Sequence, residues 1–364
     1  MRDPAPIVYY ITAHGYGHGV RSCDILRALR RADPLRPIRV VTDLPVDFLR
    51  SRLDLPVDAY RPGAFDVGMV QLDSIRVDVA ETGRRLDDLM ARRPALRDQE
   101  RAFLRDVGAG LVVADIPGIP LEAASHERIP TLAVGNFTWD WIYEEFAGRG
   151  DGWRRAIEAF REGYAATDLL LRLPFSEPMA SFPRQEHIPL VASPGRDRRA
   201  ELAAAYGIDP SVRWVLLSFT TLDWDDATVA ALARDPGHAF LTVLPLGWTG
   251  RNFFGIDRHR FPFSDVIASC DVVVSKPGFG ILSECVVNNK TLVYAERTEF
   301  REYPILEDAL RQVLRHVHIP AEALYRGELA PYLDAADHAP EPRARCSAGG
   351  DVVAAERILD YAGG

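Results

Sequence analysis

Two histidines in a glycine-rich segment are the first residues of this chain that could do chemistry. His14 and His18 lie in the segment Thr12–Ser22. Imidazole titrates close to neutral pH, and a histidine oriented by a carboxylate can remove the proton of a substrate hydroxyl. Asp115 directly follows the apolar run Leu111–Ala114 and is the natural partner. Two alternatives stay open, because a single histidine is more often structural and Asp115 could instead cap the next helix.

A second segment, Val272–Glu284, has the pattern strand, loop, helix and the chemistry of an anion site. Free N–H groups at the start of the expected helix near Gly280 would attract an anion, and Lys276 adds a positive charge beside them. Glu284 lies about one turn into the helix and could accept hydrogen bonds from hydroxyl groups that the phosphate carries. The Walker A pattern is absent. The alternative is a tight turn with a solvated Lys276.

Dinucleotide and metal sites are less favoured by the sequence. The glycines at 15, 17 and 19 have the spacing GxGxG, whereas the dinucleotide fingerprint is GxGxxG, and Asp43 lies too far along to be its ribose-binding acid. The 4 cysteines form no CxxC pair and have no histidine at zinc-ligand spacing. The nearest carboxylate group, Asp223–Asp226, is better explained as a helix N-cap. We therefore expect no metal and no nicotinamide or flavin cofactor.

These residues must be positioned by an alternating strand and helix pattern, which is typical of a parallel sheet covered on both faces. The expected strands are Ile7–Ala13, Ile38–Thr42, Leu111–Ala114, Thr131–Val134, Trp214–Phe219, Ala239–Leu244, Asp271–Val274 and Thr291–Tyr294. The expected helices are Val20–Arg31, Leu86–Val107 with an interruption near Pro94, Ala156–Tyr164, Ala200–Tyr206, Ala227–Arg234, Gly280–Val287, Glu302–Leu314 and Asp351–Tyr361. The pattern restarts after the proline-rich stretch Leu173–Pro194, which we interpret as a linker. The sequence thus predicts two Rossmann-like, doubly wound α/β domains facing each other, 1–190 and 191–345, followed by a helix in 346–364.

Composition and charge narrow the class of partner. The net charge of -9 argues against a protein that binds nucleic acid by neutralising phosphates. No apolar run approaches the roughly 20 residues that span a bilayer, and no signal peptide is recognised, so a soluble, cytoplasmic protein is expected. Basic and aromatic residues mix in 251–261, where a solvated loop is favoured over a lipid contact. We expect neither nucleic-acid binding nor stable membrane insertion.

Three stretches of the chain resemble a known superfamily. Gly15–Arg21, Asn136–Tyr143 and Ser275–Glu284 are similar, in this order and separation, to segments of GT-B glycosyltransferases. The closest likeness is to the glycosyltransferase-like N-terminal region of plant L-arabinokinases. No ATP-cradling loop is found, so the resemblance does not imply kinase activity. It implies a GT-B fold with an acceptor-side domain in 1–190, a domain for the nucleotide sugar in 191–345, and a terminal helix that packs back on the first domain.

The resemblance also implies roles for individual residues. It makes His18 the base and Asp115 the residue that orients it. It places on the acceptor side the residues His14, Tyr16, Asn136 and Trp139, the last with an aromatic face that stacks on a sugar unless it is simply packed in the core. It assigns to the nucleotide the residues Ser218, Thr220, Ser275, Lys276, Gly278, Phe279, Gly280 and Glu284. Ser218 and Thr220 stand where the family usually has a glycine-rich turn, so their hydroxyls would replace backbone amides. Glu302 falls in the region that contacts the donor sugar.

The expected activity is transfer of a hexosyl or N-acetylhexosaminyl group from a nucleoside-diphosphate sugar to an acceptor hydroxyl. The resemblance favours a UDP-sugar as co-substrate, inversion at the sugar, and no metal. Two alternatives stay open: a non-catalytic or regulatory module that binds nucleotide sugars, because fold does not fix function, and a sugar-nucleotide epimerase of the same fold. The acceptor and the oligomeric state are not predicted.

Overall fold

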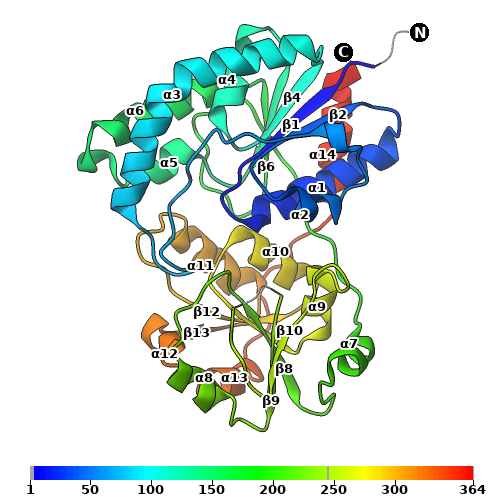
Figure 1. The fold of residues 1–364 in the computed structure, drawn as a ribbon, viewed down its shortest axis with the longest axis vertical. Helices are drawn as coiled ribbons and strands as arrows, with labels where there is room; N and C mark the ends of the chain where they lie inside the picture. The colour runs from blue at the N-terminus through cyan, green and yellow to red at the C-terminus, as the bar shows by residue number, and fades with distance from the viewer. Residues whose placement is uncertain (1–3, 244–245, 364) are drawn as a thin grey trace. The chain divides into compact units, whose positions relative to one another are not determined.

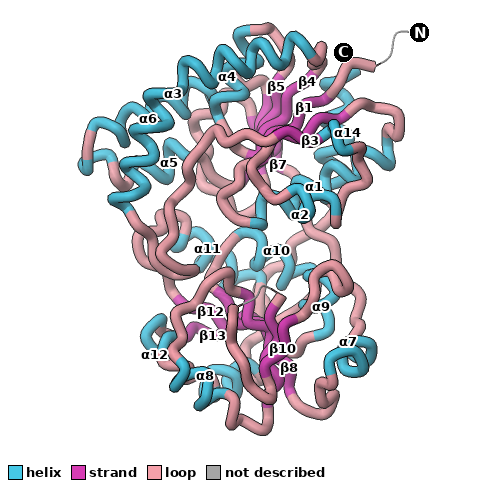
Figure 2. Tube along the Cα trace, viewed as in Figure 1, coloured by secondary structure: helices cyan, strands magenta, loops and turns pink. Residues whose placement is uncertain are grey.

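The computed structural model describes residues 4–243 and 246–363, which form two compact units (Figure 1). Unit 1 consists of the residues up to Val70, of Asp78–Ala192 and of the stretch from Ser347 onward. Unit 2 consists of Gln71–Val77 and Ser193–Cys346. Leu244, the last residue of one expected strand, lies outside the described residues. Figure 2 shows that helices flank the strands of each unit.

Unit 1 is built on a parallel sheet that has seven strands within its described residues, in the order β3-β2-β1-β4-β5-β6-β7. The strands are β1 (Ile7–Ile11), β2 (Ile38–Val41), β3 (Tyr60–Arg61), β4 (Leu111–Asp115), β5 (Thr131–Gly135), β6 (Leu169–Arg172) and β7 (Gln185–His187). The central strands β1, β4 and β5 are buried along their whole length, as continuous apolar runs require. Strand order reverses between β1 and β4, and such a switch point is where open α/β sheets bind ligands at the carboxyl ends of the strands.

The helices of unit 1 cover both faces of this sheet. They are α1 (Tyr16–Ala32), α2 (Val46–Arg50), α3 (Val79–Asp106), α4 (Gly118–His126), α5 (Trp139–Glu144), α6 (Asp151–Ala165) and α14 (Gly350–Gly363), with short 3-10 turns at Val57–Ala59 and Ala147–Arg149. The expected interruption near Pro94 is wrong, because α3 runs through it. Pro94 is exposed, so water can solvate the carbonyl that loses its partner, while Arg93 pairs with Glu122 of α4 at 2.8 Å and holds the helix in place.

The last helix, α14, packs on the first, α1. Figure 1 shows the two helices side by side. Ala354, Ala355 and Ile358 belong to the same buried cluster as Ile25 and Leu29. The chain therefore ends in unit 1 after passing through unit 2.

Unit 2 repeats the strand order of unit 1. Its described residues form a six-stranded parallel sheet in the order β10-β9-β8-β11-β12-β13. The strands are β8 (Arg213–Ser218), β9 (His238–Thr242), β10 (Phe253–Gly255), β11 (Val272–Ser275), β12 (Thr291–Ala295) and β13 (His316–Ile319). The helices are α7 (Arg199–Tyr206), α8 (Asp226–Leu232), α9 (Phe263–Ser269), α10 (Phe279–Val287), α11 (Tyr303–Val313), α12 (Ala321–Tyr325) and α13 (Ala330–Ala336). The switch point of this sheet lies between β8 and β11.

The prediction of a doubly wound α/β fold is confirmed, with local corrections. The expected linker Leu173–Pro194 contains β7, so it is not free of regular structure. The N-cap interpretation of the Asp223–Asp226 cluster is confirmed, since the Asp225 side chain accepts a hydrogen bond of 2.8 Å from the Thr228 N–H at the start of α8.

A short segment from the N-terminal half, 71–77, belongs to unit 2, which the sequence did not indicate. Ile75 is 2% exposed and lies in the core cluster of unit 2. Asp73 accepts hydrogen bonds from the backbone N–H of Ile75 and of Arg76, each at 2.8 Å, and from the Tyr325 hydroxyl at 2.9 Å. The segment is therefore a built part of unit 2.

Candidate functional site

The His18–Asp115 pair exists in the structure and lies at the switch point of unit 1. Asp115 is the last residue of β4, and its backbone carbonyl accepts a hydrogen bond of 2.8 Å from Thr12, just beyond β1. Helix α1 begins at Tyr16, so His18 stands in the first turn of a helix and not in a loop. Its Nδ1 lies 2.8 Å from Asp115 Oδ1. Asp115 is therefore the partner of His18 and does not cap a helix.

Two glycines make this placement possible. Gly15, the residue before α1, has φ of 88°, a left-handed conformation that glycine adopts most readily. At Gly19, a Cβ atom would lie 2.6 Å from side-chain atoms of Leu44 and of Phe48. The close approach at Gly19 is thus made by side chains of unit 1, and it fixes α1 against the segment after β2.

Arg21 completes the cluster and was not assigned a role from the sequence. Its Nε and Nη2 donate to Asp115 Oδ2 and Oδ1 at 2.6 and 2.5 Å, and the Ser22 hydroxyl donates to Oδ2 at 2.9 Å. Arg21 lies one helical turn after His18, a spacing that could have indicated a shared partner. Asp115 is thus a fully occupied acceptor.

The charges of this cluster favour a neutral His18 beside an ionised Asp115. Burial acts to raise the pKa of Asp115, but the Arg21 guanidinium, His18 and their hydrogen bonds hold it well below its usual range. Burial, and then the charge of Arg21, lower the pKa of His18 below its ordinary value. Nδ1 of His18 lies 2.9 Å from Nη2 of Arg21 as well as 2.8 Å from Asp115 Oδ1. The tautomer that donates Nδ1–H to the Asp115 carboxylate leaves the lone pair of Nε2 to accept a proton.

Two of the expected acceptor-side residues are buried and hydrogen-bonded to other residues of unit 1. Asn136 is 4% exposed; its Oδ1 accepts from Arg21, and its Nδ2 donates to the Pro174 carbonyl at 2.7 Å. Trp139 is 1% exposed, and its Nε1 donates to Asp66 Oδ2 at 2.9 Å. The expectation of an exposed tryptophan face is therefore wrong, and the alternative of core packing holds.

His14 and Tyr16 remain partly exposed at this edge of the sheet. The His14 ring meets the Trp139 ring edge-on at 5.2 Å between centroids, and Tyr16 meets Phe48 in the same way at 5.0 Å. Their acceptor-side role stays a prediction.

Asp66 is a second carboxylate near this cluster that the sequence gave no signal for. It accepts a hydrogen bond from the Thr12 hydroxyl at 2.7 Å in addition to that from Trp139. Burial raises the pKa of Asp66 to about 6. Because Thr12 directly follows β1, Asp66 belongs to the same edge of the sheet as Asp115.

In unit 2, the hydroxyls of two residues assigned to the nucleotide, Ser275 and Thr220, make contacts within the unit. Ser275 is 1% exposed and donates to the Ser218 backbone carbonyl at 2.7 Å, which joins the ends of β11 and β8. The Thr220 hydroxyl lies 3.0 Å from the Ser74 hydroxyl, whose oxygen also accepts from the backbone N–H of Thr220 and of Thr221 at 3.1 and 3.2 Å. Segment 71–77 therefore contacts the turn after β8, and the nucleotide role of Ser218, Thr220 and Ser275 stays a prediction.

The start of α10 keeps the properties of an anion site. Gly278 is its N-cap; from the described residues it receives no side-chain cap, and its first turn holds no acidic residue. The first helical residues, Phe279 and Gly280, bring their N–H groups to this end. A Cβ atom built at Gly278 would have no described heavy atom within 4 Å. The backbone here is thus open to a close approach.

Lys276 and Glu284 flank this helix start. Lys276 is partly buried, so the alternative of a solvated lysine is wrong. Burial, and then the charge of Arg297, lower the pKa of Lys276 to about 7. Glu284 is 6% exposed and lies in the second turn of α10. Glu302, the expected donor-sugar residue, is the N-cap of α11, and its Oε1 lies 3.9 Å from Nη1 of Arg297.

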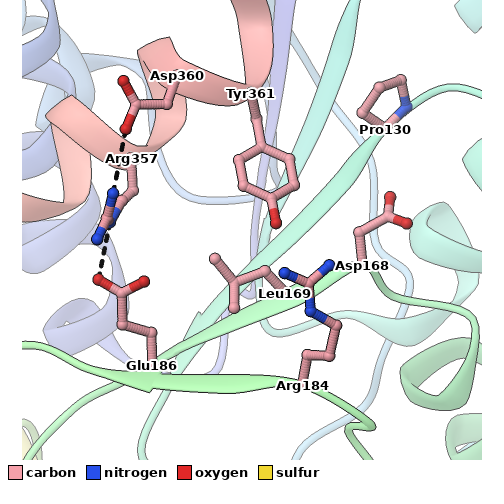
Figure 3. A pocket seen from close by; sticks show the side chains of 8 residues that line it. All are labelled: Pro130, Asp168, Leu169, Arg184, Glu186, Arg357, Asp360 and Tyr361. Carbon is pink, nitrogen blue, oxygen red and sulfur yellow. Dashed lines mark hydrogen bonds and ion pairs between the residues drawn. The ribbon is translucent and has the colours of Figure 1, made fainter. Parts of the chain in front are cut away.

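A shallow pocket at the other edge of the unit 1 sheet is distinct from these residues (Figure 3). It lies where β5 and β6 begin, and ligand sites of parallel sheets lie at the opposite, carboxyl ends. Arg357 pairs there with Glu186 at 2.7 Å and with Asp360 at 3.2 Å. The pocket is lined by Pro130, Asp168, Leu169, Arg184, Glu186, Arg357, Asp360 and Tyr361.

The described residues contain no group of three or more His, Cys, Asp or Glu side chains that could hold a metal ion. Within the same residues, every helix is too short or too polar to cross a membrane.

Comparison with known proteins supports the fold and the resemblance. No protein-family model matches the chain. The chain is 28% identical over 344 residues to an L-arabinokinase of Arabidopsis thaliana; the match covers 90% of this chain but 32% of the relative, so the chain spans about a third of its length. The solved structure of a UDP-glucose: anthocyanidin 3-O-glucosyltransferase in complex with UDP is similar with a TM-score of 0.61 and 13% identity, over 100% of both chains. The UDP-GlcNAc 2-epimerase of Neisseria meningitidis bound to UDP-GlcNAc is similar with a TM-score of 0.58 and 12% identity, over 98% of both chains. The chain therefore has the GT-B fold, and its resemblance to the glycosyltransferases and to the arabinokinase is confirmed.

Proposed function

We propose that this protein is a glycosyltransferase that moves a sugar from a UDP-sugar to an acceptor hydroxyl with inversion and without a metal ion. The single observation that supports it most is the contact of 2.8 Å between His18 Nδ1 and Asp115 Oδ1 at the switch point of unit 1. In the tautomer that donates Nδ1–H to Asp115, Nε2 of His18 can take the proton of an acceptor hydroxyl.

The acceptor half of the reaction rests on the neutral state of His18. A histidine with a lowered pKa stays unprotonated at neutral pH and also at pH values at which an ordinary histidine begins to take up a proton. Asp115 and Arg21 are buried and hydrogen-bonded to each other, so the imidazole is held by a rigid cluster. Positioned general bases of this kind contribute about 10²–10⁴-fold to rate.

The donor half rests on the start of α10. Its N–H groups and Lys276 supply positive charge for a diphosphate, and we assign Glu284 to accept hydrogen bonds from ribose hydroxyls. In the reaction the bond between the anomeric carbon and the β-phosphate oxygen breaks, and the leaving diphosphate gains negative charge. Fixed positive groups at that position stabilise the transition state more than the bound donor.

The test separates binding from turnover. UDP-sugars are screened for binding by calorimetry and for transfer or hydrolysis by release of UDP. We expect Glu284→Ala to weaken nucleotide binding, and His18→Ala to bind the donor as the parent protein does but to lose about 10²–10⁴-fold in turnover. His187→Ala and Glu158→Ala, at exposed positions of unit 1, are matched controls. Equal loss of binding in the His18 and Glu284 variants would contradict these roles.

A second candidate is a sugar-nucleotide epimerase, which the fold likeness to the UDP-GlcNAc 2-epimerase favours. Incubation with UDP-GlcNAc in deuterated water, without an acceptor, distinguishes the two. An epimerase would give the C2 epimer with deuterium at C2, whereas a transferase would leave C2 unlabelled. A protein that binds UDP-sugars but gives neither product nor transfer would be the non-catalytic module.

A further inference from the structure

Arg297 is a buried cation whose partners within unit 2 do not satisfy it. It lies two residues beyond the end of β12, next to β11 in the sheet, where Tyr294 is in register with Ser275. Because parallel strands end at the same edge, Arg297 and Lys276 leave the sheet side by side. Arg297 is 7% exposed, and among the described residues no hydrogen-bond acceptor contacts its Nε or Nη2.

The contacts that Arg297 does make leave Nε and Nη2 of its guanidinium buried without a hydrogen-bond partner among the described residues. Nη1 lies 3.9 Å from Glu302, which is too long for a hydrogen bond, and the guanidinium lies over the Phe300 ring. Burying a guanidinium without hydrogen bonds is costly, and arginine keeps its charge in proteins. Burial lowers the pKa of Arg297 to about 9, with the charges of Glu302 and then of Asp73 opposing the shift. Nε and Nη2 form the fork that binds two oxygens of a phosphate.

Three sources of positive charge therefore meet at this edge of unit 2: Arg297, Lys276 and the start of α10. The charge of Arg297 repels that of Lys276 and, after burial, helps to lower the pKa of the Lys276 amine. Two like charges held together in a partly buried place repel each other. The acidic groups that act on Arg297 are Glu302, 3.9 Å away, and Asp73, whose carboxylate is already paired with Arg76 at 2.5 Å. An anion with more than one negative charge would satisfy this arrangement.

We propose that Arg297 is a second cation that binds the diphosphate of the nucleotide sugar together with Lys276. This inference rests on the proposed function and names a catalytic residue that the resemblance did not assign. As the anomeric carbon leaves the β-phosphate oxygen, the electron pair of that bond stays on the oxygen. The acceptor oxygen forms the new bond to carbon, and its proton passes to His18 Nε2. Arg297 stabilises the charge that develops on the β-phosphate, since its fork matches two phosphate oxygens.

The experiment compares UDP with UMP, which lacks the β-phosphate. Calorimetry at pH 6.5 keeps Lys276 largely protonated. We expect Arg297→Gln to weaken UDP binding by about 10- to 100-fold, as the loss of a charge-assisted hydrogen bond does, and to change UMP binding less than about twofold. Arg297→Lys should recover part of the UDP affinity. Arg326→Gln, an exposed arginine of the same unit, is the matched control and should change neither.

Three results would overturn the proposal. UDP binding unchanged in Arg297→Gln would remove the contact altogether. Equal weakening of UDP and UMP would show that Arg297 acts through the fold, and a thermal melt of each variant would reveal it. Unchanged UDP binding with weakened UDP-sugar binding would place Arg297 on the sugar. If the parent protein binds neither UDP nor UMP, the proposed function itself fails, whereas parent binding with an unchanged variant defeats Arg297 alone.

Discussion

Lys276 allows a quantitative test of the anion site, because the charge it needs is lost close to neutral pH. Burial and the charge of Arg297 lower its pKa to about 7. Only the protonated amine attracts a diphosphate, so affinity is fully present well below pH 7 and falls as the pH rises above it. If the neutral amine contributes nothing, the apparent Kd increases by the factor 1 + 10^(pH − pKa).

The expected magnitude follows from that relation. Between pH 6 and pH 8.5 the factor rises from about 1.1 to about 33, so the apparent Kd for a UDP-sugar should increase about 30-fold, equivalent to about 2 kcal/mol. UDP-glucose is a suitable probe, because its diphosphate is esterified at both ends and keeps a constant charge over this range. Isothermal titration calorimetry in two buffers of different ionisation enthalpy also reports the proton taken up on binding at pH 8.5.

Lys276→Met is the control for this interpretation. It should bind UDP-glucose about 10- to 100-fold more weakly at pH 6 and lose most of the pH dependence. An unchanged Kd from pH 6 to pH 8.5 in the parent protein, with no proton uptake, would refute the reasoning. The same slope in parent and Lys276→Met would assign the pH dependence to another group.

Two further predictions concern the buried clusters. Asp115→Asn should lower turnover by about 10²–10⁴-fold. It should also destabilise the fold by about 3–5 kcal/mol in urea unfolding, because Arg21 is left as an uncompensated buried charge. The double variant with Arg21→Gln should regain stability but not turnover, and recovery of both would exclude an orienting role for Asp115. Ile75→Ala should lower the free energy of unfolding by about 2–5 kcal/mol in the same measurement, since Ile75 is buried in the core of unit 2. Leu72→Ala, at a 61% exposed position of the same segment, should change it by less than about 0.5 kcal/mol. A similar loss of stability in both variants would mean that segment 71–77 does not pack in unit 2 as described.

The central strands were predictable because they are locally encoded. Runs such as 7–13 and 111–114 are mainly apolar, so each run predicts a strand that is covered on both faces. The short edge strands β7 and β10 were not predicted from the sequence, because they are only half-buried. Their sequences, Gln185–His187 and Phe253–Gly255, do not form continuous apolar runs. The continuity of α3 through Pro94 was not predicted either, because the ion pair between Arg93 and Glu122 of α4 is a contact between distant parts of the sequence.

The pairing of His18 with Asp115 was predictable from topology, while its surroundings were not. Both residues follow central strands, and the carboxyl ends of parallel neighbours meet at one edge. Which other groups reach Asp115 depends on helix rotation and rotamers. Arg21 contacts it across 94 positions of the sequence, and Asn136 contacts Arg21 across 115. Sequence alone therefore assigned Asn136 to a substrate, whereas the structure uses it to hold Arg21.

The turn after β8 likewise depends on residues that are distant in the sequence. Serine and threonine there suggested that hydroxyls replace phosphate-binding amides. Segment 71–77 instead brings Ser74 to those amides, and nothing local to Thr220 encodes a contact with a residue 146 positions away. Ser74 accepts from the backbone N–H groups of Thr220 and Thr221, so they are not free for a ligand in this structure. In our proposal a phosphate is bound instead by the start of α10, Lys276 and Arg297, whose Nε and Nη2 have no hydrogen-bond partner among the described residues. Side-chain cations would then supply the charge that backbone amides supply at other phosphate sites.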